Sequence, residues 1–190
     1  MWFLPDRDLQ VMPAVEQLSS LIPPPHQPQY VPTSKDWQKF IEVNGVDVPP
    51  EFRTLVNVYG VGCFDNFLWL YSPITPNQYL NICEKTKLRA SKFDVYRRAG
   101  LNVPFVIYPE SKGVMIWGGT DNGDALCWKT AEATGEVVIN QGSLHEWEDT
   151  HMAIPEFLLK LFRREYKCRL FPDDFPSDTP KFVPWREQQN

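Results

Sequence analysis

The chain has 190 residues, of which 43% are hydrophobic and 23% are charged, a composition typical of a soluble globular protein. A chain of this length fits one domain with a sizeable core. No apolar run approaches the ~20 residues that a membrane helix needs. The apolar start at Met1–Leu4 is followed at once by Pro5 and charged residues, which argues against a signal peptide. We therefore expect a cytoplasmic protein that does not associate with membranes.

The cysteines lie far apart in the sequence, at Cys63, Cys83, Cys127 and Cys168. Zinc sites normally take their ligands from closely spaced pairs. Reduced and mostly buried thiols are the better interpretation for a cytoplasmic chain. We expect no metal and no cofactor.

The N-terminal part predicts a helix followed by a proline-rich linker. Apolar residues recur at helical spacing from Val11 to Ile22, and Pro23–Pro25 ends that helix. The residues before Met12 look like an addition, and we place no core residues there. The expected organisation is an extension at 1–32, a main domain at 33–170 and a proline-rich tail packed on that domain at 171–190.

Two further helices are expected at the start of the main domain. Ser34 is a suitable N-cap for the first of them, and Gly45 is a suitable stop. Pro50 suits the first turn of the second helix, which places Phe52 and Tyr59 on one apolar face.

The other elements outside the central hairpin follow from apolar runs, caps and prolines. They are a buried strand at Asn66–Tyr71, a helix from Thr75 to Arg98, a strand at Pro104–Tyr108 and a last helix at Glu156–Tyr166. The tail is expected to be irregular because of its prolines, with Phe175, Phe182 and Trp185 packed on the domain.

The strongest local signal is Asn122-Gly123 between two runs that can form strands, which predicts a β-hairpin. The expected strands of this region are Gly113–Ile116, Ala125–Lys129 and, after Gly135, Val137–Ile139. Gly118 and Gly119 indicate a bulge or a close backbone approach. Hairpin-linked strands beside sequential helices predict a single α+β domain, with a mainly antiparallel sheet, a central β-meander and flanking helices.

The negative charge is concentrated in the hairpin region. Residues 117–150 carry seven acids and one base, net −6, whereas the rest carries 17 acids and 18 bases, net +1. This distribution argues against nucleic-acid binding there and favours a basic protein partner. A charge-rich solubilising surface is the plainer interpretation. The expected partner-binding residues are Trp117, Asp121, Asn122, Asp124, Glu146, Trp147, Glu148 and Asp149.

Catalytic and metal-binding patterns are weak. No nucleophile elbow, P-loop, HExxH or EF-hand spacing is present. His145 and His151 flank an acidic run that could hold a metal, but a solvated loop before the last helix is favoured. Asp121 and Asp124 could act as a glycosidase pair, but beside an Asn-Gly turn they are better interpreted as turn residues.

The seven tryptophans raise the possibility of stacking on sugars. Trp37 and Trp69 lie on apolar faces and are expected in the core, and Trp117 and Trp128 could pack across the sheet. Only Trp147 stands in a plainly polar stretch. Most of the tryptophans are therefore expected to be core residues.

Several segments together resemble the SUKH superfamily of bacterial immunity and cell-wall-assembly-regulator proteins. They are Trp37 followed by Gly45, Val48–Phe52, Tyr59–Gly62, Asp65–Trp69, the hairpin residues Trp117, Thr120–Asp124 and Trp128, and Pro172–Pro176, which resembles the tail of actinobacterial members. Val48 and Phe52 stand where the family usually has Leu and Tyr.

This resemblance implies an α+β fold and a non-enzymatic protein that binds another protein, most often a toxin. An immunity protein of this kind occludes the active site of its toxin, and many such toxins are nucleases with basic grooves. Two other functions stay open: a carbohydrate-binding module or small glycan-acting enzyme, and a housekeeping scaffold without a toxin partner.

Overall fold

The computed structural model describes residues 13–142 and 146–186. Seven strands form one antiparallel sheet in the order β6-β5-β4-β3-β2-β1-β7, and β3 to β6 form a meander. The strands are β1 (Gly62–Phe64), β2 (Leu68–Leu70), β3 (Val114–Thr120), β4 (Ala125–Lys129), β5 (Glu136–Asn140), β6 (Trp147–Ala153) and β7 (Phe182–Pro184). The helices are α1 (Ala14–Leu21), α2 (Ser34–Asn44), α3 (Pro50–Tyr59), α4 (Ile82–Arg98) and α5 (Ile154–Phe162). The expected α+β class is confirmed.

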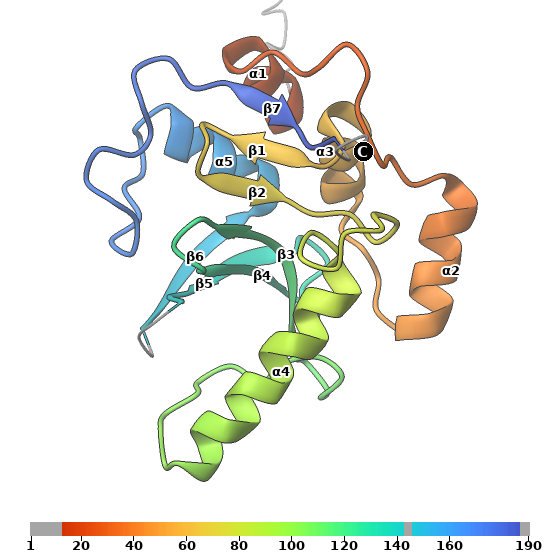
Figure 1. The fold of residues 1–190 in the computed structure, drawn as a ribbon, viewed down its shortest axis with the longest axis vertical. Coiled ribbons are helices and arrows are strands. Elements are labelled where there is room, and N and C mark those ends of the chain that lie inside the picture. The colour runs from red at the N-terminus through yellow and green to blue at the C-terminus, as the bar shows by residue number, and fades with distance from the viewer. Residues whose placement is uncertain (1–12, 143–145, 187–190) are drawn as a thin grey trace, which may run out of the picture.

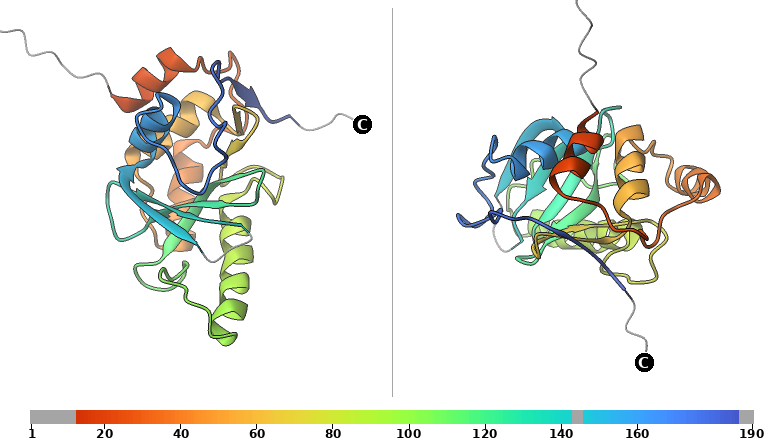
Figure 2. Two further views of the ribbon diagram at one scale, coloured as in Figure 1. Left: turned by 90° about the vertical axis from the view of Figure 1, so that its left-hand side faces the viewer. Right: turned by 90° about the horizontal axis from the view of Figure 1, so that it is seen from above.

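The helices lie on two sides of this sheet. α1, α3 and α5 lie together on one side, whereas α4 crosses the other side and projects beyond the strands (Figures 1 and 2). Within the described part of the chain, no helix has both the length and the apolar character that would let it cross a membrane.

The central hairpin turns where the sequence predicts. The Gly123 N–H donates to the Thr120 carbonyl at 2.9 Å, and the Thr120 N–H donates to the Asp124 carbonyl at 3.2 Å. Gly123 has a φ of 82°, so the loop has three residues and ends on a left-handed glycine. This geometry differs from the tightest Asn-Gly turn, in which both residues have positive φ.

The close approach expected at Gly118 is also present. The pairing of β3 with β4 shifts between Ile116 and Gly118, and a Cβ on Gly118 would lie 2.5 Å from the Trp69 carbonyl oxygen. Any side chain there would push β2 away from β3. Gly118 therefore allows the meander to join the rest of the sheet.

The core is built around Phe52 of α3, which is fully buried. Its ring centroid lies 5.4 Å from that of Trp128 and 6.3 Å from those of Trp37 and Trp117. These aromatic contacts join α2, α3 and the hairpin in one apolar cluster. Burial of Trp37, Trp117 and Trp128 confirms their predicted place in the core, whereas Trp69 is half-buried.

The N-terminal helices are close to the prediction. Val15, Leu18 and Ile22 are buried in the same core as the sheet, so α1 packs as part of the domain. α2 begins at Ser34, with Thr33 as the N-cap in a reciprocal pair with Asp36. The predicted start of the first helix at Val11 and the proposed addition before Met12 lie outside the described residues.

Two predicted elements before the hairpin were wrong in whole or in part. The strand expected at Pro104–Tyr108 is absent from the described chain, where this segment makes one isolated bridge through Ile107. Pro104 and the adjoining Pro109 have no N–H to donate to a ladder. The helix expected from Thr75 begins at Ile82 instead. Side chains of Thr75 and Asn77 bond to nearby backbone N–H groups, which favours turns over helix.

Three corrections concern the C-terminal half. The stretch expected to be a solvated loop before the last helix is strand β6 from Trp147 onward; as an edge strand it tolerates polar residues. α5 ends at Phe162, four residues before the predicted end. The irregular tail contains β7, which pairs with the outer edge of β1, an edge position at which Pro184 is tolerated.

Candidate interaction face at the turn end of the sheet

Two of the predicted site residues, Glu148 on β6 and Glu146 just before it, pair with one arginine. Arg169 Nη1 lies 2.9 Å from Glu146 Oε2, and the Arg169 backbone N–H donates to Glu148 Oε2 at 3.1 Å. The Tyr166 hydroxyl also donates to Glu148. Both carboxylates therefore have intramolecular partners, and the single arginine cancels one of their two charges.

A lysine holds the next pair of acids. Lys129 Nζ lies 2.9 Å from Glu136 Oε2 and 2.8 Å from Asp149 Oδ2. Burial lowers the pKa of Lys129, but hydrogen bonds to Asp149 and Glu136 outweigh this effect, so the pKa lies above its ordinary value. His151 completes a group whose ligand atoms lie within 4.8 Å of one another. Because the ammonium group already bonds both carboxylates, we assign this group to an ion-pair network. His145 lies outside the described residues.

Two other predicted site residues are buried and serve the fold. Asp124, which is 4% exposed, accepts hydrogen bonds from Thr120 Oγ1 at 2.6 Å and from the Gly142 N–H at 2.9 Å. It thereby joins the β3–β4 turn to the β5–β6 turn. Trp117 is fully buried between Phe52 and Phe157. Neither residue offers a surface to a partner.

Trp147 lies in a less polar setting than its sequence neighbours indicate. It is half-buried, and its ring centroid lies 5.2 Å from those of both Phe93 and Phe105. The indole therefore helps to attach α4 and the segment after it to the sheet.

Asp121 and Asn122 are the predicted site residues that remain exposed at the hairpin tip. Asp121 Oδ1 accepts a hydrogen bond from Trp69 Nε1 at 2.7 Å, which fixes the carboxylate at the end of the sheet. Because Asp124 is buried and held by Thr120 and Gly142, the two aspartates have separate structural roles. This arrangement disfavours the catalytic pairing of Asp121 with Asp124.

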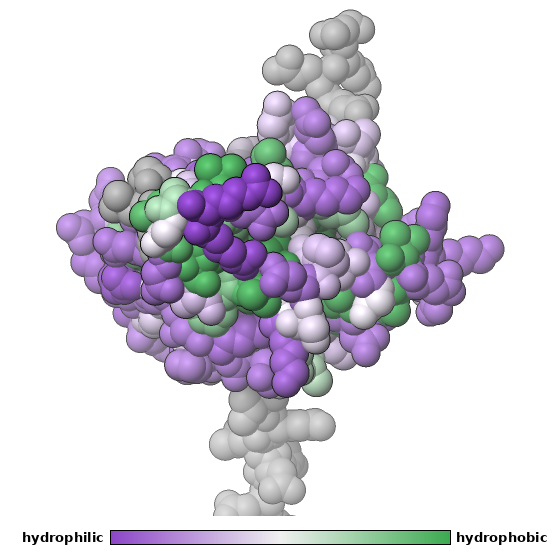
Figure 3. Space-filling model, turned by 90° about the horizontal axis from the view of Figure 1, so that it is seen from below, coloured by the Kyte–Doolittle hydropathy of each residue, from purple (hydrophilic) through white to green (hydrophobic). Residues whose placement is uncertain are grey.

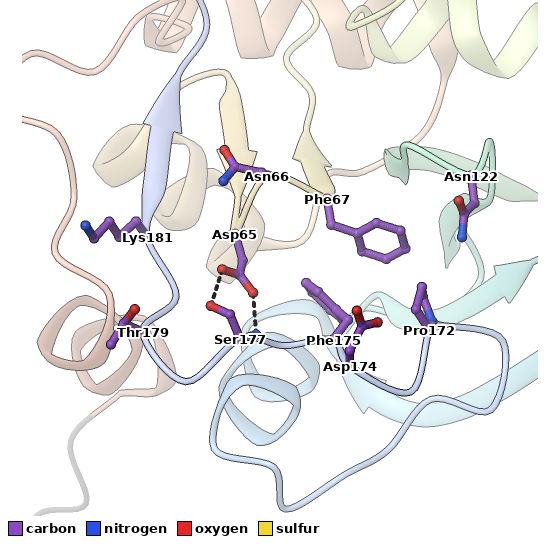
Figure 4. A pocket seen from close by; sticks show the side chains of 10 residues that line it. All are labelled: Asp65, Asn66, Phe67, Asn122, Pro172, Asp174, Phe175, Ser177, Thr179 and Lys181. Carbon is purple, nitrogen blue, oxygen red and sulfur yellow. Dashed lines mark hydrogen bonds between the residues drawn. The ribbon is translucent and has the colours of Figure 1, made fainter.

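A pocket of about 580 Å³ lies beside the hairpin tip, between the β1–β2 turn and the C-terminal segment (Figure 4). Phe67 and Phe175 lie side by side in it, with ring centroids 4.6 Å apart. The lining residues are Asp65, Asn66, Phe67, Asn122, Pro172, Asp174, Phe175, Ser177, Thr179 and Lys181.

The local chain geometry explains why Asp65 and Asn66 lie here. Both have a φ of 52°, a left-handed conformation that Asp and Asn tolerate better than most residues. The Asp65 carboxylate accepts hydrogen bonds from the Ser177 N–H at 2.7 Å and from the Ser177 hydroxyl at 2.6 Å. These bonds hold the C-terminal segment against the β1–β2 turn.

The carboxylates around the pocket differ from those on β6 because no base is paired with them. Within the part of the chain that the structure describes, Asp65, Asp121 and Asp174 form no ion pair. The Lys181 side chain points away from the phenylalanine rings (Figure 4). The neighbouring Asp173 is instead paired with a lysine.

The charges of two of these carboxylates act on the buried thiol of Cys63. Burial raises the pKa of its thiol to about 12, and the charges of Asp121 and Asp65 contribute to the rise. Arg89 of α4 reaches the hairpin, where it donates to the Gly123 carbonyl at 2.8 Å and to the Asn140 side chain. Neither of these acceptors is a carboxylate.

We call this surface the turn face. It consists of Asp65, Asn66, Asp121, Asn122 and Asp174 around Phe67 and Phe175. The sequence analysis placed only Asp121 and Asn122 in the site. Asp65 and Asp174 were overlooked because they lie far away in the sequence, although both fall in segments that carry the family resemblance.

Comparisons with protein-family models, with curated proteins and with solved structures found no match for this chain. No family is assigned. The function must therefore be argued from the residues and their geometry.

Proposed function

We propose that the chain is a non-enzymatic protein-binding domain of the immunity type. It binds a toxin through the turn face and occludes a basic active-site groove, such as that of a nuclease. The observation that carries this proposal is the gathering of Asp65, Asp121 and Asp174 around two half-buried phenylalanines, with no base of the described chain paired with any of the three.

The physical argument is one of complementarity. Carboxylates that lack an intramolecular base can attract a basic partner and accelerate association. Phe67 and Phe175 supply the apolar surface that interface centres usually need. The strands and the Asp65–Ser177 hydrogen bonds hold these groups in place, so little ordering free energy is lost on binding.

The resemblance to SUKH proteins supports the same proposal. In this structure Trp117 and Trp128 of the hairpin motif are buried, whereas Asp121 and Asn122 of the same motif are exposed. One motif thus builds the scaffold and presents polar groups at its tip. The cytoplasm is the proposed compartment, which suits four cysteines that are all free thiols.

The test is co-production of this chain with the product of a toxin-like gene encoded beside its own. We expect the wild-type chain to restore growth to cells that make the toxin and to form a complex with it. Asp174→Lys should slow association about tenfold and reduce its salt dependence, because a carboxylate on the turn face becomes a base. Glu132→Lys, a matched reversal on the exposed β4–β5 turn, should leave the rate within about twofold.

Two outcomes would contradict the proposal. One is a complex whose association is slowed equally by the two variants. The other is the absence of both binding and growth rescue with every toxin-like neighbour.

A carbohydrate-binding role is the second candidate, and the composition of the pocket is what favours it. Aromatic rings beside carboxylates and amides are groups that can hold a polar ligand in a fixed orientation. Trp69, whose indole N–H donates a hydrogen bond to Asp121, would report such binding through its fluorescence. Saturable quenching by a soluble glycan, abolished in Asp174→Ala, would favour this role over toxin binding. No change in tryptophan fluorescence with any of the soluble glycan pools would contradict the carbohydrate-binding role.

A further inference from the structure

The outward face of α4 is the main apolar surface that the core leaves uncovered. α4 buries only Ile82, Thr86 and Phe93. Of the large hydrophobic side chains that are exposed in the described chain, Leu88 and Val95 lie on α4, and Ile74, Tyr79 and Leu101 lie in the segments that precede and follow it. Seen from the end at which α4 projects, hydrophobic surface borders strongly hydrophilic side chains (Figure 3). Patches of this kind are typical of interaction sites.

The exposed side chains form a stripe. Leu88 and Val95, each 60% exposed, are seven residues apart and therefore lie on one side of the helix. Tyr79, which is 62% exposed, joins Leu88 in the lining of a groove of about 390 Å³ between α4 and the preceding loop. The stripe thus begins in a groove and continues along the projecting half of the helix.

Basic residues flank this stripe on both sides. At 3.6 residues per turn, Lys85 and Lys92 fall on one side of the Leu88–Val95 line, and Lys87 and Arg98 fall on the other. Lys87 pairs with Glu84 on the same side, and Lys92 donates to the Gly142 carbonyl, so Lys85 and Arg98 are the bases of these rows without such a bond in the described chain. The helix as a whole carries six bases and two acids, a net charge of +4. This charge is opposite in sign to that of the turn face.

We propose that this face of α4 binds an acidic amphipathic helix of a protein partner. An apolar stripe between two basic rows complements a helix whose leucine-like face is bordered by carboxylates. Pairing with α4 of a second copy is disfavoured, because it would bring the basic rows together. A nucleic acid is disfavoured because the exposed stripe offers its phosphates apolar side chains. The proposal is independent of the turn face.

The probe is a fluorescent synthetic peptide with leucines at i, i+3, i+4 and i+7 and glutamates elsewhere, titrated with the whole chain and followed by anisotropy. The wild-type chain should bind it saturably. Leu88→Gln/Val95→Gln should weaken binding about tenfold or more, as expected when apolar anchors are lost. Val43→Gln is the matched control, because Val43 is 71% exposed on another helix; it should change binding by less than about twofold.

Several results would overturn the proposal. One is equal binding of the peptide by Leu88→Gln/Val95→Gln, here called the anchor variant, and by the Val43→Gln control. Another is equal binding of a peptide that has the same composition but scattered leucines. A third is the absence of saturable binding. Tighter binding of duplex DNA than of the peptide would assign the face to nucleic acid. Dimers that dissociate in the anchor variant would assign it to a second copy. Circular dichroism should show that the variants keep the fold, because the substituted side chains are exposed.

Discussion

The acids on and beside β6 and the acids of the turn face have the same chemistry but different surroundings. Arg169 pairs with Glu146 and Glu148, and Lys129 pairs with Glu136 and Asp149, so that each base cancels one of two negative charges. On the turn face, Asp65 and Asp121 accept hydrogen bonds from neutral groups. The first set therefore stabilises the domain, whereas the second leaves its charge available to a partner.

This difference teaches that charge density along a sequence does not give the charge of a surface. The concentration of acids in residues 117–150 is real, but Arg169, which lies outside that range, pairs with two of them. A paired carboxylate gives up most of its long-range field. The consequence can be tested by removing members of each set.

The largest expected loss of stability is for a substitution of Asp124, the buried acid that joins two turns through its hydrogen bonds. Asp124→Ala leaves the Thr120 hydroxyl and the Gly142 N–H without their acceptor inside the protein. We expect a loss of about 2 to 4 kcal/mol in the free energy of unfolding, measured with urea. Asn122→Ala, at the exposed tip of the same turn, should cost less than about 0.5 kcal/mol. Similar values for the two variants would show that Asp124 has no special role.

The next largest loss of stability distinguishes Glu148 from Glu146, the two acids that pair with Arg169. Glu148→Gln places an amide group opposite the Tyr166 hydroxyl or the Arg169 N–H, both of which are donors. It should cost about 1 to 2 kcal/mol in urea unfolding. Glu146→Gln removes only a solvent-exposed ion pair and should cost less than about 0.5 kcal/mol. A larger cost for Glu146→Gln would reverse the assignment.

Lys129→Met tests the second ion-pair group, in which Lys129 pairs with Glu136 and Asp149. We expect a loss of about 1 kcal/mol at neutral pH, because two half-buried carboxylates lose their counter-charge. The pKa of Lys129 is raised in the folded state. Its contribution should therefore be fully present below the ordinary lysine pKa of about 10.5. It should be lost as the pH rises through the folded-state value. A stability difference between variant and wild type that grows with alkaline pH would contradict this account.

The smallest effect on stability is expected on the turn face itself. Asp121→Asn/Asp174→Asn keeps the acceptor for Trp69 Nε1 and should change the free energy of unfolding by less than about 0.5 kcal/mol. It should nevertheless slow association with a basic partner. Asp47→Asn/Glu132→Gln makes the same change in net charge at exposed sites outside the turn face, and it serves as the control. A marked loss of stability would place these acids with the structural set.

The fold was more predictable than the site because its signals are local. Helix caps, the Asn122-Gly123 turn and the glycines beside Trp117 each specify geometry within a few residues. β6 and β7 were missed because edge strands may be polar or contain proline, and only the pairing partner reveals them. Thr75 is a further example. Its side chain could cap a helix, but it accepts a hydrogen bond within a turn instead, and α4 begins at Ile82.

The candidate site depends on contacts over long sequence separations. Asp65 bonds to Ser177, and Trp69 bonds to Asp121. Trp117 was expected both to pack across the sheet and to bind a partner, and its burial against Phe157 is compatible only with the first of these roles. Asp121 and Asn122 could be found from the sequence because an exposed hairpin tip is itself a local feature.

The most direct test of the account is a map of the surface potential. Paramagnetic relaxation of backbone amide protons by a cationic and an anionic nitroxide of equal size reports the local potential at each residue. The account predicts that the cationic nitroxide relaxes the amides of Asp121, Asn122 and Asp174 more strongly than the anionic one, because nearby unpaired carboxylates attract it. The preference for the cation should be clearly smaller at the amides of Glu146 and Asp149, because a base cancels one of every two carboxylate charges there. A preference for the cation along β6, with none on the turn face, would contradict the account.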